Sequence, residues 1–275
     1  MQRNRWLQIV LLIWCVCLLN AFTASCQKKW LSLRIISYNI HHANPPSAPG
    51  VINTDSVAGV IMKYQPDMVA LQEVDVNTSR SGKGLNEAKA IAEKAGMQYR
   101  FAKSIDYAGG DYGIAILSRY TFDSFRVHKL PSANVRAEAR VLAIGYFTKE
   151  KQAFAFACTH LDAEGDNTNR LLQMKVIDSV LRYVKMPVVL AGDFNSEPVN
   201  PVIGLLDEKF KRTCVDSCGN TFPSDRPAKI IDYIAIKRTV NCEVVRHEVL
   251  PEPFPSDHLP ILAEVRINGT KTKTK

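Results

Sequence analysis

The sequence has few of the features that mark non-globular proteins. Glycine and proline occur 14 times each in 275 residues, and charged residues make up 23% of the chain against 46% hydrophobic residues. This composition excludes a collagen-like repeat and an intrinsically disordered chain. No repeat of fixed period and no Walker-type glycine-rich loop is present. The sequence therefore predicts neither a solenoid nor a P-loop nucleotide-binding site.

Dense basic runs are also missing. The chain has 35 Lys and Arg against 27 Asp and Glu, which gives a formal net charge of +8. Such an excess permits an anionic partner, such as nucleic acid, a phosphorylated substrate or a membrane surface, but it is equally typical of ordinary solubilising charge. Because Lys and Arg are not interleaved with aromatic residues in one run, charge alone does not indicate nucleic acid.

An apolar run occupies the N-terminus. Arg3 and Arg5 precede apolar residues 9–19, and small residues lead up to Cys26. This order predicts a secretory signal peptide over residues 1–25, and it resembles a bacterial lipoprotein signal in which Cys26 becomes the lipidated first residue. We expect an exported protein, either a cell-envelope lipoprotein with a membrane tether at Cys26 or a periplasmic or secreted protein. An uncleaved anchor is the alternative, although the run is shorter than the about 20 residues of a membrane span.

Removal of this segment takes away two arginines and no acidic residue, which lowers the net charge from +8 to +6. Four cysteines remain after Cys26. Cys158 lies inside an apolar strand, where we expect a buried and inert thiol. Cys214 and Cys218 flank three polar or small residues and could form a small disulfide, but without a nearby pair of histidines they do not predict a zinc site.

Hydrophobic periodicity predicts alternating helices and strands with more strands than helices. The expected helices are a segment capped by Thr54 that continues to Tyr64, then residues 85–95, which Gly96 ends, and residues 169–184. Strands are predicted over residues 33–38, 68–72, 99–102, 113–118, 122–128, 136–147, 152–159, 188–191, 230–236, 242–249 and 261–267. Because helices do not follow every strand, we expect two packed sheets flanked by helices within a single domain over residues 30–267. Residues 268–275 form a basic tail that we expect to be disordered.

Polar side chains stand where several of the apolar strands end. These candidates are Asn39, Glu73, His160, Asp193 and Asn195, with Asp232 and the pair Asp257 and His258 late in the chain. If the strand ends converge, they supply carboxylate and amide oxygens for a hard divalent cation and two histidines for proton transfer or charge stabilisation.

Each candidate taken singly has an ordinary explanation. An Asp or Asn after a strand is usually a turn former, and a lone histidine is usually structural, a class in which we place His41, His42, His128 and His247. Glu73 by itself could be a solvated loop charge. The joint occurrence of these residues carries the prediction.

At this point the sequence resembles the endonuclease/exonuclease/phosphatase superfamily, which includes DNase I-like nucleases, abasic-site endonucleases, neutral sphingomyelinases and inositol polyphosphate 5-phosphatases. The resemblance implies an α/β (α+β) fold, a four-layer α/β/β/α sandwich of two mostly antiparallel sheets flanked by helices. The motifs that carry it occur in order: Ser37-Tyr38-Asn39, Leu71-Gln72-Glu73-Val74, residues 112–119, Thr159-His160-Leu161, Gly192-Asp193-Phe194-Asn195, Ile231-Asp232-Tyr233-Ile234 and Ser256-Asp257-His258.

The resemblance also implies roles for these residues. Glu73 is the main Mg²⁺ ligand, Asn39 a ligand or phosphate contact, and Asp257 a second metal ligand. Asp193 orients and deprotonates the attacking water, with Asn195 fixing the phosphate or that water. His258 stabilises the charge that develops on the phosphoryl group and Asp232 orients it, while His160 is a general acid or phosphate contact. Tyr112 lies in the third motif and is a further substrate contact. The helix residue Arg170 is a plausible phosphate contact because its fork of donors suits phosphate oxygens.

These roles predict an exported phosphoesterase that depends on Mg²⁺, with Mn²⁺ as a substitute, and hydrolyses a phosphodiester or phosphomonoester by attack of an activated water. The substrate is either nucleic acid or a phospholipid or other small phosphoester, and the core motifs do not choose between them. We expect a monomer. The alternative from another class is a catalytically silent, surface-tethered binding protein on the same scaffold.

Overall fold

The computed structural model describes residues 30–133 and 137–268. The predicted signal peptide, the lipidation candidate Cys26 and residues 269–275 of the predicted tail lie outside the described residues. Asn268, which the sequence analysis assigned to the tail, is instead the buried last residue of a strand. No helix in the described part of the chain is long and apolar enough to cross a membrane.

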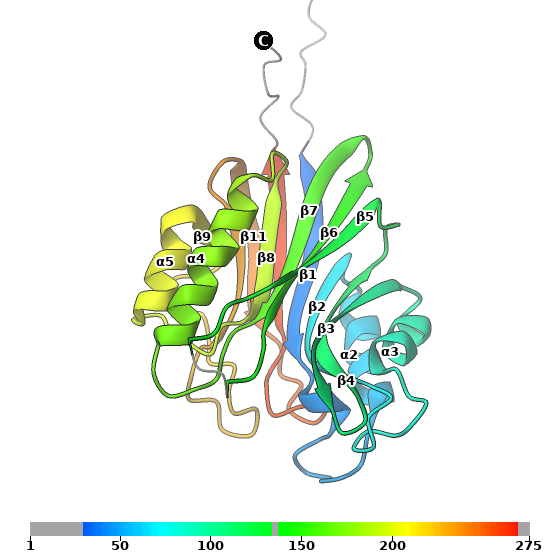
Figure 1. Ribbon diagram of the computed structural model, residues 1–275. Coiled ribbons are helices and arrows are strands. Elements are labelled where there is room, and N and C mark those ends of the chain that lie inside the picture. The colour runs from blue at the N-terminus through cyan, green and yellow to red at the C-terminus, as the bar shows by residue number, and fades with distance from the viewer. Residues whose placement is uncertain (1–29, 134–136, 269–275) are drawn as a thin grey trace, which may run out of the picture. The chain divides into compact units, whose positions relative to one another are not determined.

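Twelve strands form two sheets of six in the described residues (Figure 1). The first sheet has the order β11-β12-β1-β2-β4-β3 and the second the order β5-β6-β7-β8-β10-β9. Only β1 with β2 and β7 with β8 pair in parallel, so both sheets are mostly antiparallel, as predicted. The bounds are β1 Leu31–Asn39, β2 Met68–Val76, β3 Gln98–Tyr107, β4 Gly110–Ser118, β5 Ser124–Lys129, β6 Val141–Lys149, β7 Gln152–His160, β8 Val188–Asp193, β9 Phe210–Arg212, β10 Asp232–Lys237, β11 Asn241–Val249 and β12 Ile261–Asn268.

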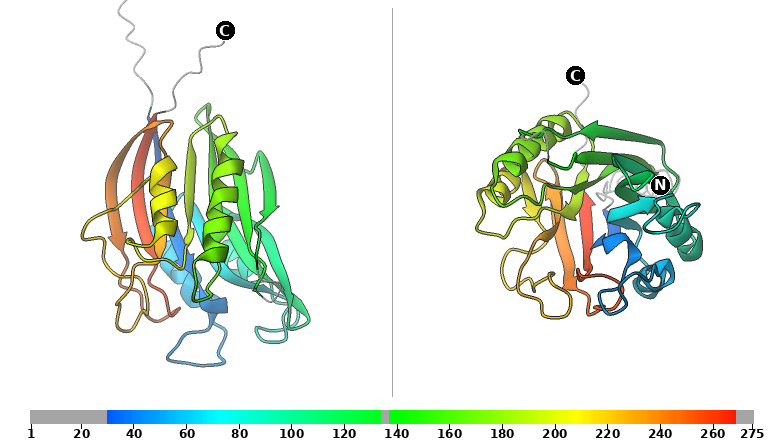
Figure 2. Two further views of the ribbon diagram at one scale, coloured as in Figure 1. Left: turned by 60° about the vertical axis from the view of Figure 1, so that its left-hand side comes forward. Right: turned by 60° about the horizontal axis from the view of Figure 1, so that its bottom comes forward.

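Helices cover the outer face of each sheet and complete the predicted four-layer sandwich (Figure 2). Helices α2 (Thr54–Tyr64) and α3 (Glu87–Ala95) pack on the first sheet, and α4 (Thr168–Arg182) and α5 (Pro201–Lys209) pack on the second. The cap of α2 is Asn53, whose side chain accepts a hydrogen bond from the N–H of Ser56, and not Thr54. The sequence analysis did not predict the short helix α5.

Alternation along each central strand divides the core into three layers. In β1, Leu33 and Ile35 pack between the sheets, while Ile36 and Tyr38 pack against the helices. Strands buried on both faces read as continuous apolar runs, which is why periodicity identified them as strands without showing which face each residue takes. The face of the strand on which a polar residue lies therefore decides whether its side chain reaches the site between the sheets.

Two strand boundaries differ from the prediction in a way that matters for the site. Strand β2 continues past Gln72 to Val76 through an irregularity in its pairing with β4. Strand β6 begins at Val141, so Arg140 precedes the strand in place of lying inside it.

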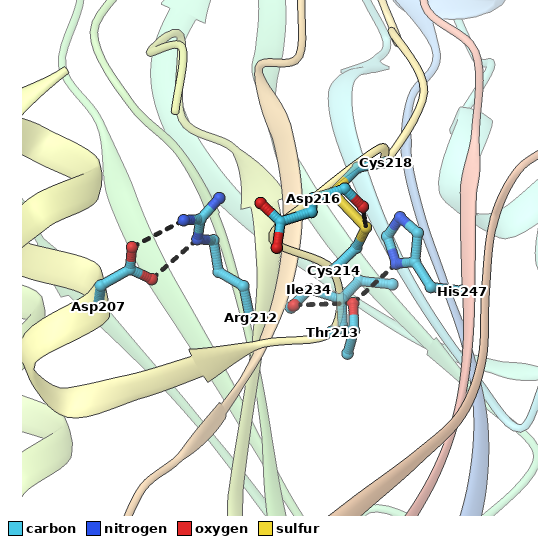
Figure 3. The surroundings of a disulfide bond; sticks show 8 residues. All are labelled: Asp207, Arg212, Thr213, Cys214, Asp216, Cys218, Ile234 and His247. Carbon is cyan, nitrogen blue, oxygen red and sulfur yellow. Dashed lines mark hydrogen bonds and ion pairs between the residues drawn. A yellow bond between two sulfur atoms is a disulfide. The ribbon is translucent and has the colours of Figure 1, made fainter. Parts of the chain in front are cut away.

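The disulfide that the sequence allowed is present between Cys214 and Cys218 (Figure 3). It follows Arg212, which forms a bidentate ion pair with Asp207, and Thr213, whose hydroxyl donates to the Ile234 carbonyl. Cys158 is a free, fully buried cysteine, as predicted, and burial raises the pKa of its thiol to about 12.

Candidate active site

Four polar side chains lie in the space between the two sheets, because each stands on the same face of its strand as the apolar residues that form the core there. Asn39 follows the inward-facing Ile35 in β1, His160 follows Cys158 in β7, and Asp193 follows Ala191 in β8, each at an even spacing. Asp232 begins β10 in phase with the inward-facing Ile234 and lies directly opposite Asp193 in the antiparallel register. Period-two geometry therefore directs all four side chains between the sheets.

Asn39 connects the two sheets at this point. Its side-chain Nδ2 donates to Glu73 Oε1 at 3.0 Å and to Asp193 Oδ2 at 3.1 Å, and it lies 3.5 Å from His258 Nε2. Its Oδ1 accepts a hydrogen bond from the backbone N–H of His41. The structure thus brings together Asn39, Glu73, Asp193 and His258 from segments that are up to 219 residues apart.

His258 lies between two buried carboxylates. Its Nδ1 is 3.0 Å from Asp232 Oδ2, and its Nε2 is 3.7 Å from Asp193 Oδ2. Burial by itself would lower the pKa of this imidazole, but the charges of Asp232 and Asp193 and the hydrogen bond to Asp232 outweigh burial and raise the pKa to about 10. His258 is therefore an imidazolium at neutral pH.

The pKa of the Asp193 carboxyl is also raised, which for a carboxyl favours the neutral form. Burial and the neighbouring charge of Asp232 raise the pKa of its carboxyl to about 7, against the lowering effect of His258 and of the hydrogen bond from the Asn195 backbone N–H. A carboxyl with a pKa near neutrality can exchange a proton at physiological pH.

His160 is neutral, in contrast to His258. Burial, followed by the charge of Arg140, holds the pKa of its imidazole well below the ordinary value. The Arg140 guanidinium lies 3.1 Å from Nδ1 and can only donate, so the proton of the neutral ring belongs on Nε2, which is 3.5 Å from Asp193 Oδ2. The side chain of Asn195 donates to the Leu161 carbonyl and lies 3.1 Å from the same Nε2.

Glu73 offers oxygen ligands of the kind that a hard cation requires. It is half-buried, and among the described residues no Lys, Arg or His forms an ion pair with its carboxylate. Asp257 lines the same cavity, with its Oδ1 4.0 Å from His41 Nδ1. The carboxylate oxygens of Glu73 and Asp257 are ligands of the kind that Mg²⁺ takes, since this ion binds oxygen and keeps several waters.

A second group of metal-ligating atoms is formed by Asp193, Asp232 and His258, whose atoms lie within 4.8 Å of one another. Here the imidazole is already bound on both sides by carboxylates and carries a proton, so this group suits proton transfer better than metal binding. The oxygen donors of Glu73 and Asp257 remain the better cation site.

Tyr112 and Arg170 also line the cavity. Burial and the charge of Glu73 raise the pKa of the Tyr112 phenol, which is therefore neutral. The Arg170 guanidinium donates to the carbonyls of Asp162 and Glu164 and to Asn167 Oδ1. These donors hold the loop after β7, and a contact of Arg170 with substrate stays a prediction.

The sequence analysis did not name several residues of the cavity wall, among them Glu138, Arg140 and Phe222. Arg140 is buried, with its Nη1 2.7 Å from Glu138 Oε1 and its Nε without a hydrogen-bond partner. The Phe222 ring lies 4.8 Å from the ring of His258. Arg140 stands at the start of a strand antiparallel to the one that ends in His160, so pairing of those two predicted strands could have indicated it.

The cavity around these residues has a volume of about 670 Å³. It opens where the two parallel strand pairs end, between the loops that follow β7 and β8 and the loop that precedes β12. This size is within the range of sites for small ligands.

The four-layer sandwich with an acid–base cluster at the carboxyl ends of its central strands is that of the DNase I-like proteins. The chain belongs to the Endonuclease/Exonuclease/phosphatase family, which its sequence matches over residues 36–258. The recognition of the family and of its fold from sequence is thereby confirmed.

Relatives of known name are distant. The chain is 25% identical over 255 residues to mouse (Mus musculus) Nocturnin, with coverage of 76% of this chain and 56% of that protein. The Xenopus laevis Nocturnin is 26% identical and 39% covered, so the chain spans about half or less of the length of these relatives. Among solved structures, the mannosyl-6-phosphatase Bt3783 of Bacteroides thetaiotaomicron superposes with a TM-score of 0.69 at 19% identity, with 85% of this chain and 99% of that chain covered.

Proposed function

We propose that the protein is an exported, divalent-metal-dependent phosphoesterase that hydrolyses a phosphate ester by in-line attack of a water molecule. The observation that supports this most strongly is the pairing of Asp193, whose carboxyl has a pKa of about 7, with the cationic His258. Burial and neighbouring charges shift the pKa values of both groups strongly, which is typical of an acid–base site.

Asp193 is the general base. Its carboxylate accepts a proton from the attacking water, and Asn39 and the Asn195 backbone N–H hold it in place from two sides. A pKa near 7 suits a base that works at neutral pH, because about half of the carboxyl groups are ionised there and the carboxylate is basic enough to take a proton.

His258 stabilises the negative charge that develops on the phosphoryl oxygens. It donates a hydrogen bond from Nε2 toward the cavity, while Asp232 holds Nδ1 and keeps the ring protonated. Arg140 and neutral His160 supply further donors on the opposite wall. The low pKa of the His160 imidazole makes it a hydrogen-bond donor in preference to a general acid.

Glu73 and Asp257 would hold the metal, which is Mg²⁺ or, as a substitute, Mn²⁺. When bound, such a cation neutralises charge on the non-bridging phosphate oxygens and positions the reacting groups. Asn39 directs its Nδ2 toward Glu73, so we assign it to orienting that carboxylate and contacting phosphate ahead of direct ligation.

Export and a tether at Cys26 form part of the proposal. They rest on the order of charged, apolar and small residues before Cys26 and agree with the disulfide, which persists in oxidising compartments. The structural neighbours include a mannosyl-6-phosphatase and a 2',3'-cyclic phosphatase, and phosphate esters are the chemistry that these two share.

The test uses the full chain with p-nitrophenyl phosphate and bis(p-nitrophenyl) phosphate, with Mg²⁺ or with EDTA. We expect hydrolysis that needs the metal and is lost in Asp193→Ala and His258→Ala, while Asp178→Ala on the surface of α4 serves as the matched control. If wild type and both variants are equally inactive on monoesters, diesters, DNA and lipids, the silent binding protein is the correct alternative. Mass spectrometry of the membrane fraction tests lipidation of Cys26.

A further inference from the structure

The charge of the cavity differs from the charge of the chain. The described residues that line it include six carboxylates, three Lys or Arg side chains and the imidazolium of His258. The carboxylates belong to Glu73, Glu138, Glu164, Asp193, Glu197 and Asp257, and the Lys and Arg side chains are Arg140, Arg170 and Lys229. A chain with a net charge of +8 thus presents an acidic wall at its site.

Two of the three Lys and Arg side chains are already bound within the protein. Arg140 lies against Glu138 and His160, and Arg170 donates to the loop that carries Glu164. Lys229 is exposed at the rim. A nucleic-acid strand binds through several phosphates at once and needs a track of such cations. In the described part of the site, positive charge is sufficient for one phosphate group but not for its neighbours in a strand.

Three of the carboxylates have no role in the proposed hydrolysis. Glu138 precedes β6, Glu164 follows β7 and Glu197 follows β8, so all three come from loops around one wall of the cavity. Glu164 and Glu197 are exposed, and Glu138 is half-buried. A carboxylate repels a second phosphate and accepts hydrogen bonds from hydroxyl groups, which are neutral donors.

Phe222 supplies a second, independent feature of the wall. Its ring is in contact with the His258 ring and lines the cavity, so it offers an apolar face close to where the phosphate binds. The C–H face of a small ring can pack on such a surface while its hydroxyl groups face the carboxylates. The volume of about 670 Å³ accommodates a compact ligand of this kind.

We propose that the substrate is a compact phosphate ester with an uncharged, hydroxyl-rich carrier, the chemical class of sugar and polyol phosphates, and not a nucleic-acid strand. This inference rests on the proposed function, because it specifies the substrate of the same site.

The first experiment measures kcat/KM of the full chain with Mg²⁺ on glucose 6-phosphate, inositol 1-phosphate, a single-stranded DNA oligonucleotide and phosphatidylinositol vesicles. We expect at least one sugar or polyol phosphate to exceed DNA and vesicles by about ten-fold or more, the factor that a few hydrogen bonds supply. A faster reaction with DNA or vesicles overturns this inference and leaves the proposed phosphoesterase intact. Failure to hydrolyse any of these compounds or p-nitrophenyl phosphate overturns both.

The second experiment replaces two wall carboxylates in the variant Glu164→Gln/Glu197→Gln, with Glu208→Gln on α5 as the matched control. We expect the ratio of kcat/KM for the preferred sugar phosphate to that for p-nitrophenyl phosphate to fall about ten-fold, mainly through KM, because the p-nitrophenyl group carries no hydroxyl group for the wall to bind. We also expect the variant to bind DNA more tightly at low salt. An unchanged substrate ratio contradicts a role of the wall in recognition.

Discussion

Replacement of Asp232 by asparagine tests whether the charge on His258 matters for the proposed reaction. The substitution keeps an oxygen near Nδ1 but removes the charge that, with Asp193, raises the pKa of the imidazole to about 10. If the pKa returns to about 6.5, the protonated fraction at pH 8 falls from about 0.99 to about 0.03, a loss of about 30-fold. Burial lowers the pKa of His258 and the remaining charges of Asp193 and Asp257 raise it, so the figure of about 30-fold applies to a pKa that returns to its ordinary value.

The sign of the effect predicts a pH-dependent defect. The imidazolium is lost as pH rises through the pKa, so the variant is most impaired at high pH, and its deficit against wild type shrinks toward pH 6. The assay is release of p-nitrophenol from its phosphate esters at saturating Mg²⁺ between pH 6 and pH 9. Asp178→Asn, which changes a surface carboxylate of α4, is the matched control.

The informative quantity is the ratio of wild-type to variant kcat/KM at each pH. A ratio that is the same at pH 6 and pH 8 refutes the reasoning, because a purely geometric role of Asp232 predicts a constant deficit. Since Asp232 is buried, thermal unfolding of the variant must first show that it is folded.

Three further results follow from the structure. Glu73→Gln should raise the Mg²⁺ concentration for half-maximal activity by about ten-fold or more, and an unchanged metal titration would remove Glu73 from the cation site. Reduction of the Cys214–Cys218 disulfide should lower the free energy of unfolding by about 2 kcal/mol in urea titrations, from closure of a short loop. Burial raises the pKa of the Glu87 carboxyl to about 8, so the stability that protonated Glu87 gives is full below pH 4.5 and lost as pH rises to about 8. Glu87→Gln should flatten that decline in urea titrations at pH 5 and pH 8, and a parallel decline would be evidence against it.

Much of the fold could be predicted because its signals are local. The helix stripe at residues 169–184 became α4, Gly96 ends α3 in a left-handed conformation, and apolar runs identified the strands of both sheets. The pairing order of those strands depends on contacts between segments that are distant in sequence, so the local pattern did not predict it. Helix α5 has only nine residues, and the local pattern did not predict it either.

The residues of the candidate site also differ in how far the local sequence pattern predicts their positions. Asn39, His160, Asp193 and Asp232 stand at even spacings from inward-facing core residues, so the strand pattern itself carries them to the space between the sheets. Arg140 was missed because the prediction places it inside a strand over residues 136–147, whereas β6 begins at Val141, directly after it. Nothing in the sequence indicated that a charged side chain inside this predicted strand would lie in a cavity.

The motif identified Glu73 as a site residue, whereas the alternation of the strand predicts a different position for its side chain. In β2, Met68 and Ala70 face the other sheet and Leu71 faces the helices, so regular alternation would bury Glu73 with Leu71 beneath α2 and α3. The structure avoids this by breaking the β2–β4 register between Leu71 and Val74, with Glu73 at a φ of 57°. A left-handed conformation at a residue other than glycine costs about 1 kcal/mol or more. The left-handed conformation places the Glu73 carboxylate at the edge of the cavity beside Asn39 instead of in the helix layer. The proposed cation site needs an oxygen ligand there.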